Sequence, residues 1–229
     1  MIRSYLKTFQ QLNDPKILKA LLFATLLTIG AIILALVFGA TILDAIMNHF
    51  SDTLESWLGK GETWFYGIAQ FLGGSLIIVL CYFLFAGIHG AFVGIFIDDI
   101  LDSIQQRHFP ETPWKKAPSV VTSCLFSMRI LLLTLGLNII ASPLLVLGWF
   151  IPPLGLSLQV ILNGYILGKE YGQIVEFRIP QNSSSSQTPK YFLNGILASL
   201  LWIVPILNFL APILLAGSVL HTRMEHKTG

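Results

Sequence analysis

Two long stretches of this 229-residue chain carry no charged side chain, and each is long enough to cross a bilayer as a helix. They run from Ala20 to Leu43 and from Thr63 to Ile97. With 54% hydrophobic residues, 11% charged residues and a mean hydropathy of +0.73, the chain is much more apolar than a soluble domain. We therefore predict an all-α integral membrane protein that forms a single membrane domain over residues 1–229.

The positions of lysine and arginine predict how the chain crosses the membrane. Asp14 and Pro15 suit the N-cap and first residue of a helix, so we place a first span over residues 17–43, entered from a cytoplasmic N-terminus. Lys60 is the only basic residue of the segment 44–62, which is therefore expected outside. A second span over residues 63–97 then returns the chain to the inside.

Both segments that border the second span are polar. In the outer segment, near-helical spacing of apolar residues predicts a helix that lies along the membrane surface: Ile46, Phe50, Leu54, Trp57 and Leu58. The inner segment, residues 98–118, is predicted to be a cytoplasmic loop. Its acidic residues Asp98, Asp99 and Asp102 are expected to face water, and we predict no metal site there.

Two further apolar segments leave the inside and return to it. Two antiparallel spans need about 40 residues, which exceeds the 191–221 segment, so this segment is predicted to be a re-entrant hairpin that penetrates the bilayer only in part. The 119–167 segment is longer, and the sequence leaves open whether it forms two spans or a hairpin. Residues 180–190 between them are predicted to be a flexible linker, and the C-terminus is predicted to be cytoplasmic.

Prolines mark the middle of both segments. We expect Pro152 and Pro153 to begin one half-helix and Pro212 another, with Asn208 placed to cap nearby. Half-helix N-termini inside the membrane would present unpaired N–H groups to an anion. The alternative is that these residues only turn the chain.

Arg129 is the one charged residue well inside an apolar segment, about 15 Å along a helix from Ser119. A buried arginine in a membrane usually faces a polar partner or cavity, so Arg129 and Asn138 are candidates for an anion path. The alternative is that the Arg129 side chain extends to the headgroups.

Small residues at four-residue spacing predict two close helix contacts, one at Ala86, Gly90 and Gly94 and one at Gly164, Gly168 and Gly172. His89 beside the first is predicted to be a packing residue. The chain shows no nucleotide loop, no metal-binding pair of histidines and no nucleophile with a base. An enzyme, a cofactor, a metal site and a nucleic-acid partner are therefore not expected.

The segment Asn163–Arg178 carries the motif residues Asn163, Gly164, Tyr165, Gly168, Lys169, Glu170 and Tyr171. This motif, the Arg107–Pro110 segment and the proline-containing C-terminal segment before His221 resemble the CysZ-like and etoposide-induced protein 2.4 family. The resemblance implies an inner-membrane oligomer with two long spans and two partly penetrating hairpins, related to proteins of bacterial sulfate uptake. Around the motif, Lys169, Glu170, Glu176 and Arg178 are expected to form a solvated cytoplasmic end.

Sulfate-permease members of that family place a glycine and arginines just before the first helix. The matching stretch here runs from Lys7 to Asp14, and its only basic side chain is Lys7. Lys7, Arg129, Asn138 and Asn208 are therefore the candidate anion-binding residues. The predicted function is passage of a small oxyanion, with a membrane scaffold or biogenesis factor as the alternative.

Overall fold

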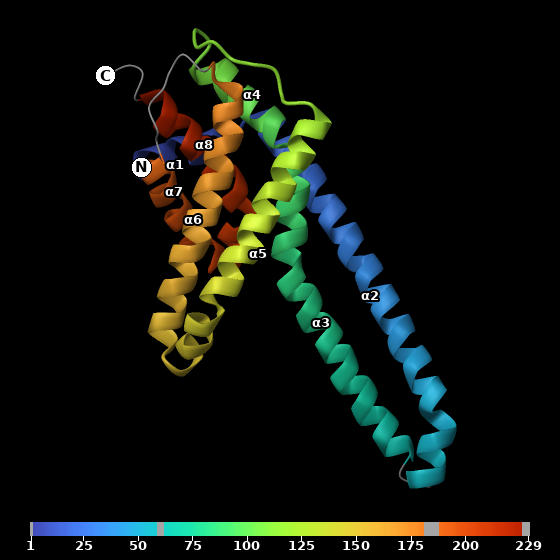
Figure 1. Ribbon diagram of the computed structural model, residues 1–229. Helices are drawn as coiled ribbons and strands as arrows, with labels where there is room; N and C mark the ends of the chain where they lie inside the picture. The colour runs from blue at the N-terminus through green and yellow to red at the C-terminus, as the bar shows by residue number, and fades with distance from the viewer. Residues whose placement is uncertain (1, 59–61, 181–187, 226–229) are drawn as a thin grey trace. The chain divides into compact units, whose positions relative to one another are not determined.

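The structure is a computed structural model that describes residues 2–58, 62–180 and 188–225, and all regular elements in these ranges are α-helices (Figure 1). The helices are α1 (Ile2–Gln11), α2 (Pro15–Leu58), α3 (Glu62–Ile95), α4 (Ile97–His108), α5 (Val120–Phe150), α6 (Pro152–Arg178), α7 (Thr188–Trp202) and α8 (Pro205–Glu225). The predicted all-α class is confirmed. Most of the predicted linker, and Lys60, lie outside the described residues.

Three helices of the described chain are long and apolar enough to cross a membrane: Pro15–Phe50 within α2, Trp64–Ile95 within α3 and Val120–Gly148 within α5. The first contains the predicted span 17–43, and the second covers the predicted span 63–97 except for its ends. The third shows that the first half of the 119–167 segment has the length of a full span. By contrast, α7 has 15 residues, or about 22 Å of helix, which is shorter than a hydrocarbon core of about 30 Å. The re-entrant hairpin over 191–221 stays a prediction.

The polar segments differ from their predictions. The prediction of a separate surface helix within residues 44–62 is wrong, because α2 continues through Asp44 to Leu58. No proline or glycine occurs between these two residues, so nothing in the sequence ends the helix there. The predicted cytoplasmic loop over 98–118 contains α4, which the apolar spacing of its buried face explains: Ile97, Ile100, Leu101 and Ile104.

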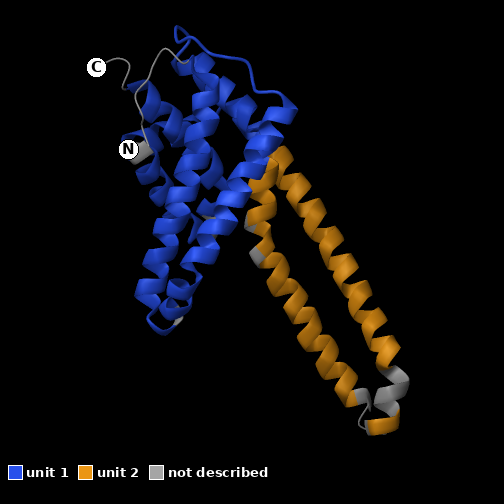
Figure 2. Ribbon diagram, viewed as in Figure 1, with its two compact units in different colours: residues 1–20, 93–229 blue, residues 21–92 orange. Residues whose placement is uncertain are grey.

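The chain forms two compact units, residues 1–20 with 93–229 and residues 21–92 (Figure 2). In the second unit, α2 and α3 meet at two glycines. A Cβ on Gly39 would lie 2.9 Å from the Ile77 side chain, and one on Gly73 would lie 2.7 Å from Leu43. The predicted single membrane domain stays a prediction.

His89 lies in the same unit and is 1% exposed. Its Nδ1 is 3.3 Å from Oγ1 of Thr28, and its ring stacks on Phe85 at 5.8 Å between centroids. The prediction of a packing histidine is therefore confirmed. A Cβ at Gly90 would meet no heavy atom of the described chain within 4 Å, and the Ala86 side chain lies outside the described residues. Gly94, in the other unit, is equally open.

In the first unit, two helical hairpins and two short helices pack together. The α5–α6 turn centres on Ile151, where Gly148 and Gly155 bring the two backbones into direct contact. Pro152 and Pro153 begin α6, as predicted.

The second apex differs from its prediction. Here α8 begins at Pro205, so Pro212 lies inside the helix and Asn208 lies in its first turn. Pro205 takes the first helical position, where a missing N–H breaks no hydrogen bond.

The glycines of the motif, which belong to α6, pack against α7. A Cβ on Gly164 would lie 2.6 Å from the Ile196 side chain, and one on Gly168 would overlap the carbonyl of Tyr191. Gly195 of α7 touches the Gly164 backbone in return. Because any side chain larger than hydrogen would separate the helices here, this contact depends on the glycines.

Candidate anion site

A pocket of about 360 Å³ opens in the first unit where α1, the end of α4 and the end of α8 meet. Its lining is Lys7, Gln10, Gln11, Arg107, His108, Phe109 and His221. Two of these seven side chains, Lys7 and Arg107, carry a permanent positive charge. The pocket therefore combines positive charge with amide donors in a space large enough for a small anion.

Two exposed ion pairs hold the permanent charges of the pocket. Nζ of Lys7 lies 2.7 Å from Oε1 of Glu225, and Nη1 of Arg107 lies 3.3 Å from Oδ2 of Asp14. The hydrogen bond from Lys7 lowers the pKa of Glu225. Exposed pairs of this kind contribute about 0–1 kcal/mol, so an incoming anion can exchange with either carboxylate.

Asp14 also positions the start of α2. Its carboxylate accepts a hydrogen bond from the backbone N–H of Lys16 at 2.8 Å, which is the predicted N-cap. Burial opposes ionisation of Asp14, but this hydrogen bond and the contact with Arg107 outweigh that effect and lower its pKa. The first helix entering the membrane is therefore tied to the pocket through Asp14.

His221 forms the inner wall of the pocket. The ring is 2% exposed and packs edge-on against His108 and Phe109, with centroids 5.9 and 5.2 Å away. Burial lowers the pKa of His221 to about 4, so the ring is neutral near pH 7. Its Nε2 lies 2.8 Å from Nε2 and 3.2 Å from Oε1 of Gln11, so the ring pairs with the Gln11 amide through Nε2. Nδ1 is buried and has no hydrogen-bond partner among the described residues.

The structure places the predicted anion-binding residues in different surroundings. Lys7 lines the pocket. Arg129 is exposed on α5 within a candidate span, and no hydrogen bond or ion pair is found for it in the described chain. Asn138 donates to the carbonyl of Thr134 at 2.8 Å. Nine residues of helix separate it from Arg129, and two and a half turns place them on opposite faces of α5.

The sequence reasoning did not select Arg107, His108 and His221 as site residues. Arg107 and His221 belong to the segments that resemble the CysZ-like family, but only the fold brings them beside Lys7. The sequence signal for this pocket was its two histidines, His108 and His221, because the chain has only five histidines.

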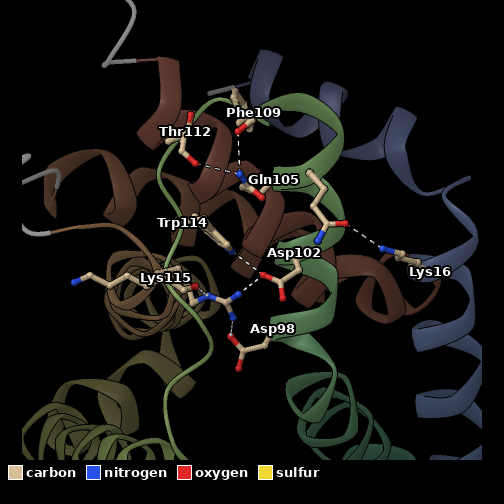
Figure 3. Close-up of polar contacts among 10 residues, drawn as sticks. Lys16, Asp98, Asp102, Gln105, Phe109, Thr112, Trp114 and Lys115 are labelled. Atoms are coloured by element: carbon tan, nitrogen blue, oxygen red, sulfur yellow. Dashed lines mark hydrogen bonds and ion pairs between the residues drawn. The ribbon is translucent and has the colours of Figure 1, made fainter.

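A second polar cluster surrounds Arg178 at the end of α6. Its guanidinium donates to Asp98 at 2.6 Å, to Asp102 and, through Nε, to the carbonyl of Lys115 at 2.9 Å (Figure 3). Trp114 donates to the same oxygen of Asp102 at 2.7 Å, and its ring lies 5.1 Å from the guanidinium carbon. The Arg178 side chain is 1% exposed.

The prediction of a solvated end at Arg178 is therefore wrong, because two carboxylates and a carbonyl replace water around the guanidinium. Glu176 makes a neighbouring pair. It lies 2.8 Å from Nε of Arg223 and accepts a hydrogen bond from Tyr191 at 2.6 Å. These contacts join α4, α6, α7 and α8 at one end, and Asp98 and Asp102 of α4 pair with Arg178. No group of metal-ligating side chains occurs in the described residues.

Comparison with known proteins adds one family. No curated protein and no solved structure matches the chain significantly. The family described as "Sulfate transporter CysZ/Etoposide-induced protein 2.4" matches residues 4–212, which is nearly the whole chain and includes Lys7, Arg107 and the glycine motif of α6. On the strength of this match, the chain belongs to the sulfate transporter CysZ/etoposide-induced protein 2.4 family.

Proposed function

We propose that this protein lets a small oxyanion, sulfate above all, cross the inner membrane of a bacterium without nucleotide hydrolysis. Its N- and C-termini face the cytoplasm, and it works as a homo-oligomer in lipid, without a cofactor or catalytic activity. Family membership and the three candidate spans support this function.

The observation that carries the proposal is the meeting of Lys7 and Arg107 at one pocket. They are a hundred residues apart, and each is held only by a weak exposed ion pair. Sulfate would displace Glu225 and Asp14 and accept hydrogen bonds from the two cations. A charge-assisted hydrogen bond contributes about 1.5–3 kcal/mol, so each cation should change the affinity about tenfold or more.

Uptake of radiolabelled sulfate into proteoliposomes tests the proposal. The wild-type protein should exceed empty vesicles, and the double variant Lys7→Gln/Arg107→Gln should lose most of the uptake. Lys116→Gln removes an exposed lysine outside the pocket and is the matched control. Uptake by the wild type no greater than that of empty vesicles would refute transport and favour a membrane scaffold or biogenesis factor.

Sidedness needs its own measurement, because the charge rule alone supports it. In a protein with Cys81 and Cys124 replaced by alanine, Ser56→Cys should react with a membrane-impermeant thiol reagent added to intact cells. Glu111→Cys should react only after the membrane is opened. The reverse pattern would overturn the cytoplasmic placement of both termini.

A further inference from the structure

Helix α1 turns its polar side toward the protein and its apolar side away from it. Ile2, Leu6 and Phe9 are 70%, 57% and 53% exposed, whereas Ser4 and Thr8 are fully buried. At 100° per residue the three apolar side chains fall within a narrow stripe opposite the two hydroxyls. An exposed apolar stripe on a helix this amphipathic requires a non-aqueous partner.

The polar side of α1 is fixed by hydrogen bonds, so the helix cannot roll to hide the stripe. Tyr5 donates to the backbone carbonyl of Asn194 at 2.6 Å, and Ser4 accepts from Thr222 at 3.4 Å. Gln11 contacts His221, as described above. Helices α1 and α8 are in close contact at Gly217, because a Cβ at this position of α8 would overlap the Thr8 side chain of α1.

The chain around α1 locates it at a membrane surface. Only three residues separate Gln11 from Pro15, where a candidate span begins, so α1 cannot lie far from the headgroups. No acidic residue occurs in α1, and its basic residues Arg3 and Lys7 lie on one flank of the stripe. Positive charge beside an exposed apolar stripe matches an anionic leaflet.

We propose that α1 is an interfacial anchor that lies on the leaflet where α2 enters. Ile2, Leu6 and Phe9 insert among the acyl chains, and Arg3 contacts anionic headgroups. The opposite side of α1 supplies Lys7 and Gln11 to the pocket, and Gln10 beside the stripe also lines it, so the lipid surface holds one wall of the pocket in place. This anchoring does not depend on whether the protein transports an anion.

Spin labels on the full-length protein test the proposal. In a background without Cys81 and Cys124, labels are placed at Leu6, Phe9 and Gln10 and the protein is reconstituted in vesicles. Labels at Leu6 and Phe9 should be accessible to oxygen and lie about 5–10 Å below the phosphates. The label at Gln10, which is exposed beside the stripe, is the matched control and should be accessible to a water-soluble nickel complex.

Two further arms identify the partner. Vesicles of phosphatidylcholine alone should leave the Leu6 label shallower than an equimolar mixture with phosphatidylglycerol, and Arg3→Gln should reduce that difference. A Leu6 label that is accessible to the nickel complex would overturn the proposal. So would a label shielded from both reagents with a short label-to-label distance, because that result identifies a second copy of the chain as the partner.

Discussion

Nη1 of Arg178 lies 2.6 Å from Oδ1 of Asp98, which joins the end of α6 to the first turn of α4, eighty residues earlier in the chain. Asp102, one turn further along α4, takes the other side of the guanidinium. Since Arg178 is buried and the two carboxylates are about one-third exposed, the arginine is the member that depends on its partners. This contact fixes the ends of two helices that local sequence does not link.

Arg178→Met should therefore destabilise the protein by about 1–3 kcal/mol, because the hydrogen bonds of the buried guanidinium to two carboxylates and a carbonyl are lost, while the partly exposed carboxylates keep contact with water. Arg178→Lys keeps the charge but not the planar guanidinium, so its stability should lie between that of Arg178→Met and that of the wild type. Lys115→Ala is the control, since only the Lys115 backbone contacts Arg178. The midpoint of thermal unfolding in detergent measures all three, and equal midpoints for Arg178→Met and Lys115→Ala would contradict the prediction.

The α6–α7 contact makes a second prediction. Gly168→Ala would drive a methyl group into the Tyr191 backbone and should destabilise the protein by about 1–3 kcal/mol. Gly136→Ala on α5 meets no described heavy atom within 4 Å and should be neutral or more stable by up to about 1 kcal/mol. Unfolding midpoints of the two variants compare the same chemical change in tight and open surroundings. A similar loss in both would show that the α6–α7 contact is not the cause.

Stability should depend on pH through His221, which lies outside the three candidate spans. Its pKa is lowered from 6.5 to about 4 in the folded protein, so below pH 6.5 the unfolded chain binds a proton that the folded chain does not. The contribution of neutral His221 is complete above pH 6.5 and should be lost progressively toward pH 4, by about 3 kcal/mol in total. Unfolding midpoints measured across this range should fall less steeply in His221→Gln than in the wild type.

Exposed His49 supplies the control for that experiment. His49→Gln keeps His221, so its stability should still fall toward pH 4. Parallel curves for the wild type and His221→Gln would show that other groups cause the loss of stability at low pH.

Arg129 makes a prediction that separates its two interpretations. If Arg129 faces an anion path, Arg129→Gln should lower sulfate uptake about tenfold, because one charge-assisted interaction is lost. The unfolding midpoint should not fall, since no contact of Arg129 is found in the described chain. Arg129→Lys should retain more uptake than Arg129→Gln. Unchanged uptake in both variants would favour a side chain that extends to the headgroups.

The helices that cross the membrane were predictable because long uncharged segments can fold in few ways in lipid. Asp14 and Pro15 marked the start of α2, and Pro152 marked the start of α6, since local chemistry decides where a helix can begin. The end of α2 was predicted too early, at Asp44, because a single aspartate does not end a helix and no proline or glycine follows before Leu58.

The site was less predictable. Lys7 was selected from its place in the chain, but Arg107 and His221 become neighbours of Lys7 only when α1, α4 and α8 pack together. The same holds for Arg178, which looks like a surface residue until its carboxylate partners on α4 are known. Pairings between distant segments leave no periodic trace in one sequence, so only the fold could reveal them.

The uninterrupted length of α2 makes it a lever. Its 44 residues form a rod of about 66 Å, roughly twice the thickness of a hydrocarbon core. Long helices adjust their inclination when the surrounding bilayer thins or thickens. A change of only about 10° in that inclination would move one end of a rod this long by about 11 Å relative to the other, so a small tilt of α2 produces a large displacement at its far end.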